Sequence, residues 1–328
     1  MEQAPFFTEI AEGPEGGQAF WARAEDGVRL RLAHWPGSST ARRGEGTVFI
    51  APGRSGYIER YGHLAKRLGE AGLGTFVIDW RGHGLSDRLT DDPKICHVAR
   101  FTDYQHDLDA MIQAARDLDL PRPWTLIGNS MGAAIALRGL VRGIELKACA
   151  FVGPMWGITL PPPVRSIAGV LSKCARLAGF GERFAPGQGG QPYVIKAPFE
   201  ENTMTGNAEE FAYWQSQAKV HPELMIGGVS FGWLNESLKE CRALAAMPSP
   251  AIPCLAFCGE ADGDVDKEVI RNRMADWPNG NYVLVPEGRH DLLSEKPVIR
   301  EPVIDQILKL MGDKADSTGR RNTSTLEV

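Results

Sequence analysis

The stretch Trp124-Thr125-Leu126-Ile127-Gly128-Asn129-Ser130-Met131-Gly132-Ala133-Ala134 joins a strand pattern to a helix pattern. The apolar run ends at Gly128, and an Ala- and Leu-rich helical pattern starts at Gly132. Between them lies Gly-x-Ser-x-Gly, which is typical of a serine on a sharp strand-to-helix turn with its hydroxyl exposed. Side chains two positions either side of the serine would collide with the neighbouring strand and helix, so glycine suits both. The stretch therefore predicts that Ser130 is a nucleophile.

A second match to the same pattern occurs at Gly228-Val229-Ser230-Phe231-Gly232. With 37 glycines in 328 residues, one accidental match is unsurprising. No convincing strand precedes it, and the bulky Phe231 occupies the tight position after the serine. We interpret Ser230 as part of a turn between helices.

Composition limits the classes of function. The chain has 328 residues, of which 43% are hydrophobic, so it can bury a large core. The net charge of −5 and the lack of a basic tract argue against a nucleic-acid partner. Residues 1–7 lack the basic and apolar regions of a signal peptide, and no apolar run approaches the ~20 residues of a membrane span. The expected location is the cytoplasm.

The cysteines and histidines show no zinc-type spacing, so no metal is predicted. We expect the cysteines to be small core residues in a reducing compartment, and they are Cys96, Cys149, Cys174, Cys241, Cys254 and Cys258.

Buried strands alternate with helices along most of the chain. After a hairpin at 20–35, apolar strands are predicted at 47–51, 74–80, 124–128, 146–152, 254–258 and 281–285. Helices are predicted at 58–71, 101–118, 132–141, 266–276 and 298–311. Strands without polar alternation, separated by helices, indicate a mostly parallel sheet with helices on both faces, which is an α/β fold.

The alternation stops between residues 155 and 247, where the patterns are helical or rich in Gly and Pro. We predict an α/β core of residues 1–154 and 248–312, with 155–247 as an inserted, mainly helical cap. Residues 313–328 are polar without an apolar face, which predicts a disordered tail.

A serine nucleophile needs a histidine base and an acid that orients it. In hydrolases with this turn the order along the chain is Ser, acid, His. His290 lies in a loop just past the strand 281–285, where the catalytic loops of open α/β sheets gather. The loop after 254–258 offers several carboxylates, among which Asp262 is favoured and Asp264 is the alternative.

The oxyanion hole is expected to use two backbone N–H groups, one from Met131 directly after the nucleophile. The other should come from the loop after strand 47–51. Because Pro52 has no N–H, we predict Arg54. His83 and His97 precede the serine and are interpreted as structural.

Five motifs stand in one order along about residues 45–312. They are Pro52-Gly53-Arg54, Asp79-Trp80-Arg81-Gly82-His83-Gly84-Leu85-Ser86, His97-Val98-Ala99-Arg100-Phe101-Thr102-Asp103-Tyr104, Gly128-Asn129-Ser130-Met131-Gly132 and Gly288-Arg289-His290-Asp291-Leu292-Leu293. Together they resemble the α/β-hydrolase superfamily, in its lysophospholipase L2-like and monoacylglycerol-lipase branch. The chain departs from the pattern at Pro52, where many relatives have histidine, and at Asp264, where they usually have an apolar residue.

The resemblance implies a serine carboxylester hydrolase with the triad Ser130, Asp262 and His290, acting through an acyl-enzyme without a cofactor or metal. The implied substrate is a small acyl ester or monoacyl lipid. The sequence leaves open another serine hydrolase activity, such as a peptidase or lactonase, and a catalytically silent binding protein on the same fold. It does not give the oligomeric state.

The cap is expected to set specificity. Trp156, Phe231 and Trp233 are candidates for an acyl pocket, although core packing is common for such aromatics. One cap helix has two faces. Its polar face carries Arg165, Gly169, Ser172, Lys173 and Arg176, and its apolar face carries Val164, Ile167, Ala168, Leu171, Cys174 and Ala175. This helix is either a lid in transient contact with a lipid surface or an amphipathic helix packed on the core.

Overall fold

The computed structural model describes residues 1–38, 46–160 and 162–312, and the side chains of these residues except 162–166. The predicted tail 313–328 lies outside the described residues.

Within these described ranges, nine strands form one sheet, in the order β1-β2-β3-β5-β4-β6-β7-β8-β9. Their bounds are β1 Glu2–Gln3, β2 Gln18–Arg23, β3 Arg29–Trp35, β4 Thr47–Ala51, β5 Gly74–Asp79, β6 Trp124–Asn129, β7 Cys149–Val152, β8 Cys254–Gly259 and β9 Gly280–Val285. The first three strands pair antiparallel, and β5, β4, β6, β7, β8 and β9 run parallel. The predicted mostly parallel sheet is confirmed.

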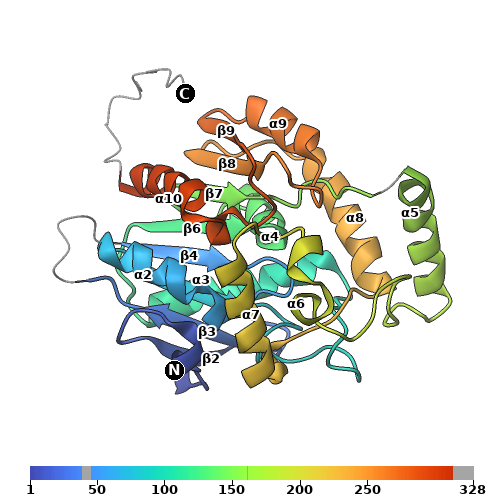
Figure 1. The fold of residues 1–328 in the computed structure, drawn as a ribbon, viewed down its shortest axis with the longest axis horizontal. Coiled ribbons are helices and arrows are strands. Elements are labelled where there is room, and N and C mark those ends of the chain that lie inside the picture. The colour runs from blue at the N-terminus through green and yellow to red at the C-terminus, as the bar shows by residue number, and fades with distance from the viewer. Residues whose placement is uncertain (39–45, 161, 313–328) are drawn as a thin grey trace.

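Helices cover both faces of this sheet (Figure 1). On one face lie α2 (Gly62–Glu70) and α10 (Pro297–Gly312), and on the other lie α3 (Tyr104–Asp117), α4 (Met131–Val141) and α9 (Lys267–Ala275). The strand β4 shows why its sequence lacks polar alternation. Val48 and Ile50 belong to one apolar core and Phe49 to the other, and all are fully buried.

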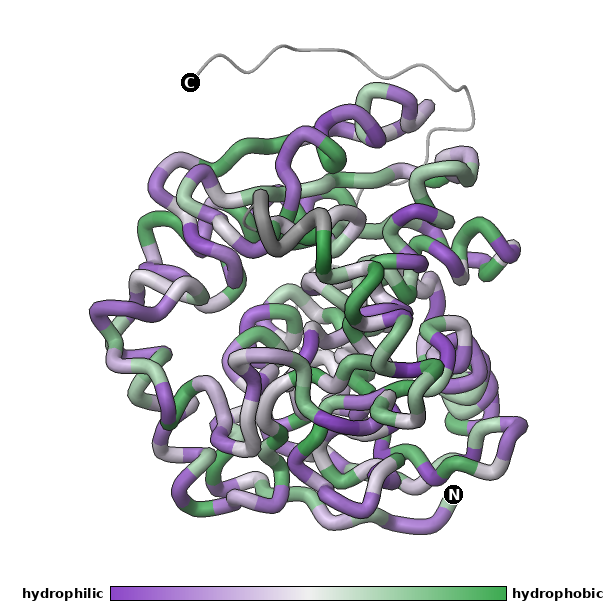
Figure 2. The backbone as a smooth tube through the Cα atoms, turned by 90° about the vertical axis from the view of Figure 1, so that its right-hand side faces the viewer, coloured by the Kyte–Doolittle hydropathy of each residue, from purple (hydrophilic) through white to green (hydrophobic). Residues whose placement is uncertain are grey.

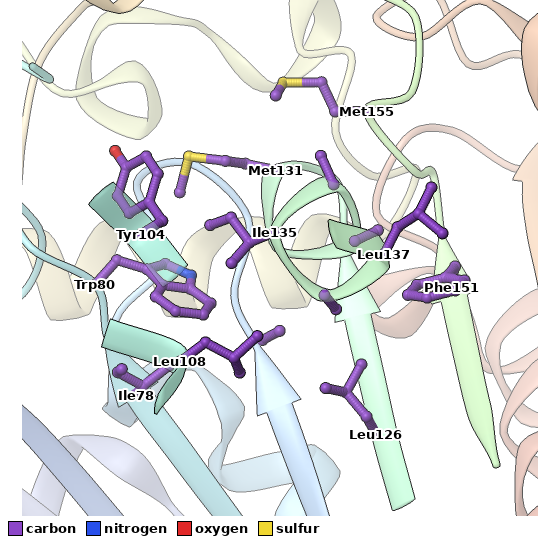
Figure 3. Packing of buried hydrophobic residues seen from close by; sticks show 14 of the residues in the cluster. Ile78, Trp80, Tyr104, Leu108, Leu126, Met131, Ile135, Leu137, Phe151 and Met155 are labelled. Atoms are coloured by element: carbon purple, nitrogen blue, oxygen red, sulfur yellow. The ribbon is translucent and has the colours of Figure 1, made fainter. Parts of the chain in front are cut away.

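The helix that follows Ser130 is packed on every side. Figure 3 shows Met131, Ile135 and Leu137 of α4 among side chains from neighbouring strands and α3. Its contacts belong to a buried cluster that includes Trp80, Tyr104, Leu108, Leu126 and Phe151. This packing fixes the start of α4 rigidly against the sheet.

Among the described residues the six cysteines are free thiols, and five of them are buried, as expected of core residues. Cys174 is the exposed exception.

The segment 155–247, which connects β7 to β8, consists of helices joined by irregular stretches in its described part. It contains α5 (Pro162–Leu177), α6 (Tyr193–Lys196), η3 (Phe199–Glu201), α7 (Ala208–Val220), η4 (Pro222–Leu224) and α8 (Phe231–Ala245). Figure 1 shows α8 lying between α4 and α5, so that α5 stands outermost. The remaining short helices are α1 (Thr8–Ala11), η1 (Ile58–Tyr61), η2 (Phe101–Asp103) and η5 (Leu292–Ser294). Every helix in the described part of the chain is too short or too polar to cross a bilayer.

The outermost helix, α5, packs on α8 through a mixed face that includes Ala168, Ser172 and Arg176. Ser172 is only 1% exposed, and its hydroxyl oxygen accepts a hydrogen bond of 3.4 Å from Asn235 of α8. Arg176 pairs with Glu236 of the same helix. The apolar residues Ile167 and Leu171 are 59% and 44% exposed. These contacts show that α5 packs on α8, and the two interpretations of this helix, a lid or a helix packed on the core, stay predictions.

Two qualifications apply to the predicted faces of α5. Ala168, from the apolar set, is buried. Val164 and Arg165 lie outside the described side chains.

Figure 2 views the molecule from the side that carries α5 and shows polar and apolar residues alternating closely along the backbone.

Candidate active site

Ser130 sits on a strained turn between β6 and α4. Its backbone has φ 48° and ψ −113°, which is a rare conformation for a residue with a side chain. A side chain at position 128 would come within 2.9 Å of the Cα of Ala133, and one at 132 would overlap the carbonyl oxygen of Ala51. The two glycines therefore allow the close approach that the sequence pattern predicts.

Ser130, His290 and Asp262 lie in one hydrogen-bonded line. The Nε2 atom of His290 is 2.9 Å from the hydroxyl oxygen of Ser130, and its Nδ1 atom is 2.8 Å from a carboxylate oxygen of Asp262. The three residues follow β6, β9 and β8 at the carboxyl ends of these strands. His290 and Asp262 are buried, whereas the serine is partly exposed. This is the geometry of a nucleophile, a base and an orienting acid.

The two candidate acids differ in their surroundings. The other carboxylate oxygen of Asp262 accepts backbone N–H bonds of 2.8 Å from Asp264 and 3.4 Å from Val265, which hold its orientation. Asp264 is exposed, and its carboxylate accepts a 3.4 Å bond from the hydroxyl of Thr203. The carboxylate that accepts the hydrogen bond from Nδ1 of His290 is thus that of Asp262 and not that of Asp264.

The same three side chains, Asp262, Asp264 and His290, are a possible metal-ligand set. One ligand atom from each lies within 4.8 Å of the others. A metal ion there would have to displace the hydrogen bond between His290 and Asp262, so this geometry suits proton transfer better.

Electrostatics favour an ionised acid and a readily protonated base. Burial by itself raises the pKa of Asp262. The hydrogen bond and charge of His290 and the two backbone N–H groups have a larger opposite effect, so the net pKa is below the ordinary aspartate value. Burial lowers the pKa of His290, and Asp262, Asp264 and Asp291 more than reverse this effect. The net pKa of His290 is therefore above its ordinary value.

This shift predicts the acid limb of the pH profile. Only neutral His290 can accept a proton. Because its pKa is raised, His290 becomes protonated, and activity is lost, at a higher pH than for an ordinary histidine. The midpoint of the acid limb of kcat/KM should therefore lie above about 6.5, the ordinary histidine value. Initial rates of ester hydrolysis from pH 5 to 9 measure it, and a midpoint clearly below that value contradicts the electrostatics described here.

The loop after β4 lies directly against Ser130. A Cβ atom on Gly53 would be 3.3 Å from the Cβ of Ser130, and Trp80 fixes the loop by donating a 2.9 Å bond to the carbonyl of Pro52. Arg54 follows Gly53 in this loop. Met131 is the first residue of α4, where backbone N–H groups have no acceptor within the helix. The predicted roles of Arg54 and Met131 in an oxyanion hole are compatible with these positions and stay predictions.

Ser230, in the second Gly-x-Ser-x-Gly match, is the N-cap of α8. It is completely buried, and its hydroxyl oxygen accepts a 3.0 Å bond from the backbone N–H of Trp233. Its other partner is His97, whose Nδ1 atom lies 2.8 Å from the same oxygen, and no sequence pattern pointed to this contact. A side chain on Gly232 would come within 2.7 Å of the His97 ring, so this glycine permits close packing.

A cavity of about 680 Å³ opens beside Ser130, between the core and the segment 155–247. Of the three predicted pocket residues, Phe231 and Trp233 line it. Trp156 does not, because it is buried beneath the site. Its ring stacks on Trp277 at a centroid distance of 6.2 Å and meets the edge of Phe151 at 5.3 Å. Trp156 is thus a core residue and we do not include it in the pocket.

The lining of the cavity combines apolar and polar side chains. Its apolar members include Met155, Ile158, Leu160, Ile167, Leu171, Met225, Ile226, Val229, Leu234 and Val265. Its polar and charged members include Arg54, Arg60, Asn129, Thr203 and Asp291. Ser130 and His290 also line the cavity.

The sequence reasoning assigned a role to Arg54 but missed the other four of these polar residues, of which three are linked by hydrogen bonds. Asp291 accepts a 3.0 Å bond from the side chain of Asn129 and a 2.7 Å bond from Arg60. The sequence signal that could have found two of them is their position next to the predicted catalytic residues, because Asn129 precedes Ser130 and Asp291 follows His290.

Comparison with known proteins gives consistent matches. The family model described as serine aminopeptidase, S33, matches residues 42–297. A lysophospholipase L2 from Escherichia coli strain K12 is 29% identical over 295 residues, which cover 86% of this chain and 85% of that protein. A monoacylglycerol lipase from Mycolicibacterium smegmatis is 30% identical over 229 residues, covering 69% and 73%.

Solved structures share the fold. A soluble variant of monoglyceride lipase from Saccharomyces cerevisiae, in complex with a substrate analog, has a TM-score of 0.67 at 18% identity, covering 88% of this chain and 93% of that one. At this level of sequence identity the match shows a shared fold and nothing about activity.

Proposed function

The chain belongs to the serine aminopeptidase S33 family of α/β-hydrolases, and from this premise we propose that it is a serine carboxylester hydrolase that acts on monoacyl lipids. The observation that carries the reaction type is the hydrogen-bonded line from Ser130 through His290 to Asp262. The relatives named lysophospholipase and monoacylglycerol lipase support the substrate class.

The reaction would proceed in two steps. His290 takes the proton of Ser130 while the serine oxygen attacks the ester carbonyl, and the N–H groups of Met131 and Arg54 stabilise the oxyanion. The ester C–O bond breaks, and the leaving alcohol receives the proton from His290. Water then attacks the acyl-enzyme with His290 again as base, which releases the carboxylic acid and restores Ser130.

The cavity supports a substrate with one acyl chain. Its volume of about 680 Å³ lies in the range of pockets that enclose a small ligand, and its lining is largely apolar. Because Ser130 and His290 belong to the same lining, an acyl chain bound against the apolar side chains would bring its ester within reach of the serine.

A substrate panel tests this proposal. We expect turnover of p-nitrophenyl esters that improves from short to medium chains, together with release of fatty acid from monoacylglycerol and lysophosphatidylcholine. An equivalent p-nitroanilide and a lactone should be poor substrates. Preferred turnover of the amide or the lactone would replace the ester proposal, and turnover of short esters without any lipid would remove the monoacyl-lipid part.

We further propose that residues 155–247 are the cap of a core made of 1–154 and 248–312, and that α5 contacts the lipid surface from which the substrate comes. The exposed apolar residues of α5 support this, since Val170 and Leu177 are 64% and 78% exposed. Lys173, also exposed, could meet anionic lipid head groups.

Removing apolar side chains from α5 should weaken binding to lipid vesicles. The double variant Val170→Ser, Leu177→Ser leaves the residues that line the cavity intact. Burying one such side chain contributes about 1.5–3 kcal/mol, so vesicle partitioning should fall at least about tenfold. Co-sedimentation with phosphatidylglycerol and phosphatidylethanolamine vesicles measures it. Val298→Ser is the control, as Val298 is 79% exposed on α10. Equal binding of all three proteins contradicts the proposed contact.

A further inference from the structure

Asp291 connects the loop of Ser130 to the loop of His290. One of its carboxylate oxygens accepts the 3.0 Å bond from Asn129, the residue before Ser130. The other accepts the 2.7 Å bond from Arg60, with only 11% of the Arg60 side chain and 6% of the Asp291 side chain exposed. A single buried carboxylate therefore joins three segments of the chain.

We propose that Asp291 is a positioning residue for Ser130 and His290, with Arg60 as its anchor. The inference rests on the proposed function, in which these two residues react together. Asp291 does not itself need to touch the substrate. It acts on His290 as the next residue in the chain, and it acts on Ser130 through Asn129, the residue before the nucleophile.

The sheet alone leaves this alignment loosely determined. Ser130 follows β6 and His290 follows β9, and two strands, β7 and β8, lie between them. Proton transfer requires the serine oxygen and the histidine nitrogen to stay at hydrogen-bond distance, and a misplacement of ~1 Å can cost on the order of 10²-fold in rate. The bridge through Asp291 ties the two loops directly, at the level of the reacting atoms.

The anchor extends to the segment 155–247. The guanidinium of Arg60 stacks on the ring of Trp214 in α7 at 3.8 Å from its centroid. The backbone N–H groups of His290 and Asp291 donate to the carbonyls of Thr203 and Met204, at 3.3 and 2.8 Å. The position of the histidine loop thus depends on contacts from the segment over the cavity as well as on the core.

A buried ion pair could also serve stability alone, so the test needs readouts that stability does not move. We would measure the rate of phosphonylation of Ser130 by a fluorophosphonate, which requires an activated serine but no particular substrate. Asp291→Asn and Arg60→Gln should each slow it by on the order of 10²-fold. Because the two residues act as one unit, the double variant should be slowed about as much as the slower single variant and not by the product of both.

The pH dependence gives a second readout. His290 is faced by the carboxylates of Asp262, Asp264 and Asp291, and Arg60 lies on the far side of Asp291. Asp291→Asn removes one negative charge that raises the pKa of His290, so the acid limb of labelling should move to lower pH. This shift checks that the Asp291 carboxylate faces His290, and the labelling rates decide whether it also positions the histidine.

Two further variants complete the design. Arg60→Lys keeps the charge and should recover much of the rate lost in Arg60→Gln, and it reports on the anchor even where Asp291→Asn does not fold. Asp109→Asn is the matched control, since its partner Arg142 lies on a different surface and its labelling should match wild type.

The outcomes separate the two proposals. Wild-type labelling without turnover of esters or lipids would overturn the proposed function and leave the bridge to be judged by its variants. A wild-type labelling rate in folded Asp291→Asn, or rates that multiply in the double variant, would overturn the bridge. A wild type that is not labelled at Ser130 would overturn both.

Discussion

Replacing Ser130 with alanine is expected to lower kcat for ester hydrolysis by on the order of 10⁴-fold or more. The hydroxyl of Ser130 is the group to which His290 is bonded at 2.9 Å, and alanine has no atom that could form the acyl-enzyme. Alanine keeps the Cβ atom, so the packing of α4 should be unaffected. Steady-state kinetics with a p-nitrophenyl ester measure the loss.

Ser230→Ala is the matched control because Ser230 occupies the other Gly-x-Ser-x-Gly pattern. Its loss removes the N-cap of α8, which should cost about 1 kcal/mol of unfolding free energy. The kcat of the folded protein should stay close to wild type. Loss of activity in Ser230→Ala, with Ser130→Ala active, would reverse the assignment of the nucleophile.

Asp262→Asn is expected to lower kcat by on the order of 10⁴-fold, because an amide cannot hold the tautomer and the positive charge that His290 needs. The 2.8 Å hydrogen bond with Nδ1 of His290 would be lost, or the amide would donate it and impose the wrong tautomer on the histidine. Asp264→Asn should lower kcat by less than about tenfold, since its carboxylate acts on His290 only through its charge.

The same ester assay on both variants, with thermal unfolding as the check on folding, separates the two aspartates. A large loss in Asp264→Asn and a small one in Asp262→Asn would make Asp264 the orienting acid, against the geometry found here.

Most of the sheet was predictable because its strands are buried on both faces. The apolar runs at 47–51 and 254–258 correspond to β4 and β8, and the hairpin around Gly27 joins β2 to β3. The order Ser, acid, His along the chain pointed to Ser130 and His290, since each follows a strand whose carboxyl end meets the same sheet edge.

The orientation of α5 was not predictable from its own residues. Periodicity defines two faces but does not say which face meets a neighbour. The answer lies on α8, where Asn235 and Glu236 bind Ser172 and Arg176, while Lys173 of the same predicted face is exposed. Trp156 illustrates the same limit, because only the position of Trp277 reveals that it belongs to the core.

The bridge through Asp291 was also beyond sequence reasoning. Its partners Asn129 and Arg60 are 162 and 231 residues away along the chain. Polar residues next to a catalytic motif are common, and only the fold shows that these three meet.

The most direct test of Ser130 as the nucleophile is to locate the acyl group during turnover. Wild-type protein would be mixed with a p-nitrophenyl ester, quenched with acid during the initial release of nitrophenol, and analysed by peptide mass spectrometry. We predict one acyl group on the peptide that contains Ser130, and none in Ser130→Ala. An acyl group on Ser230, or a release burst without any adduct on Ser130, would contradict the proposed mechanism.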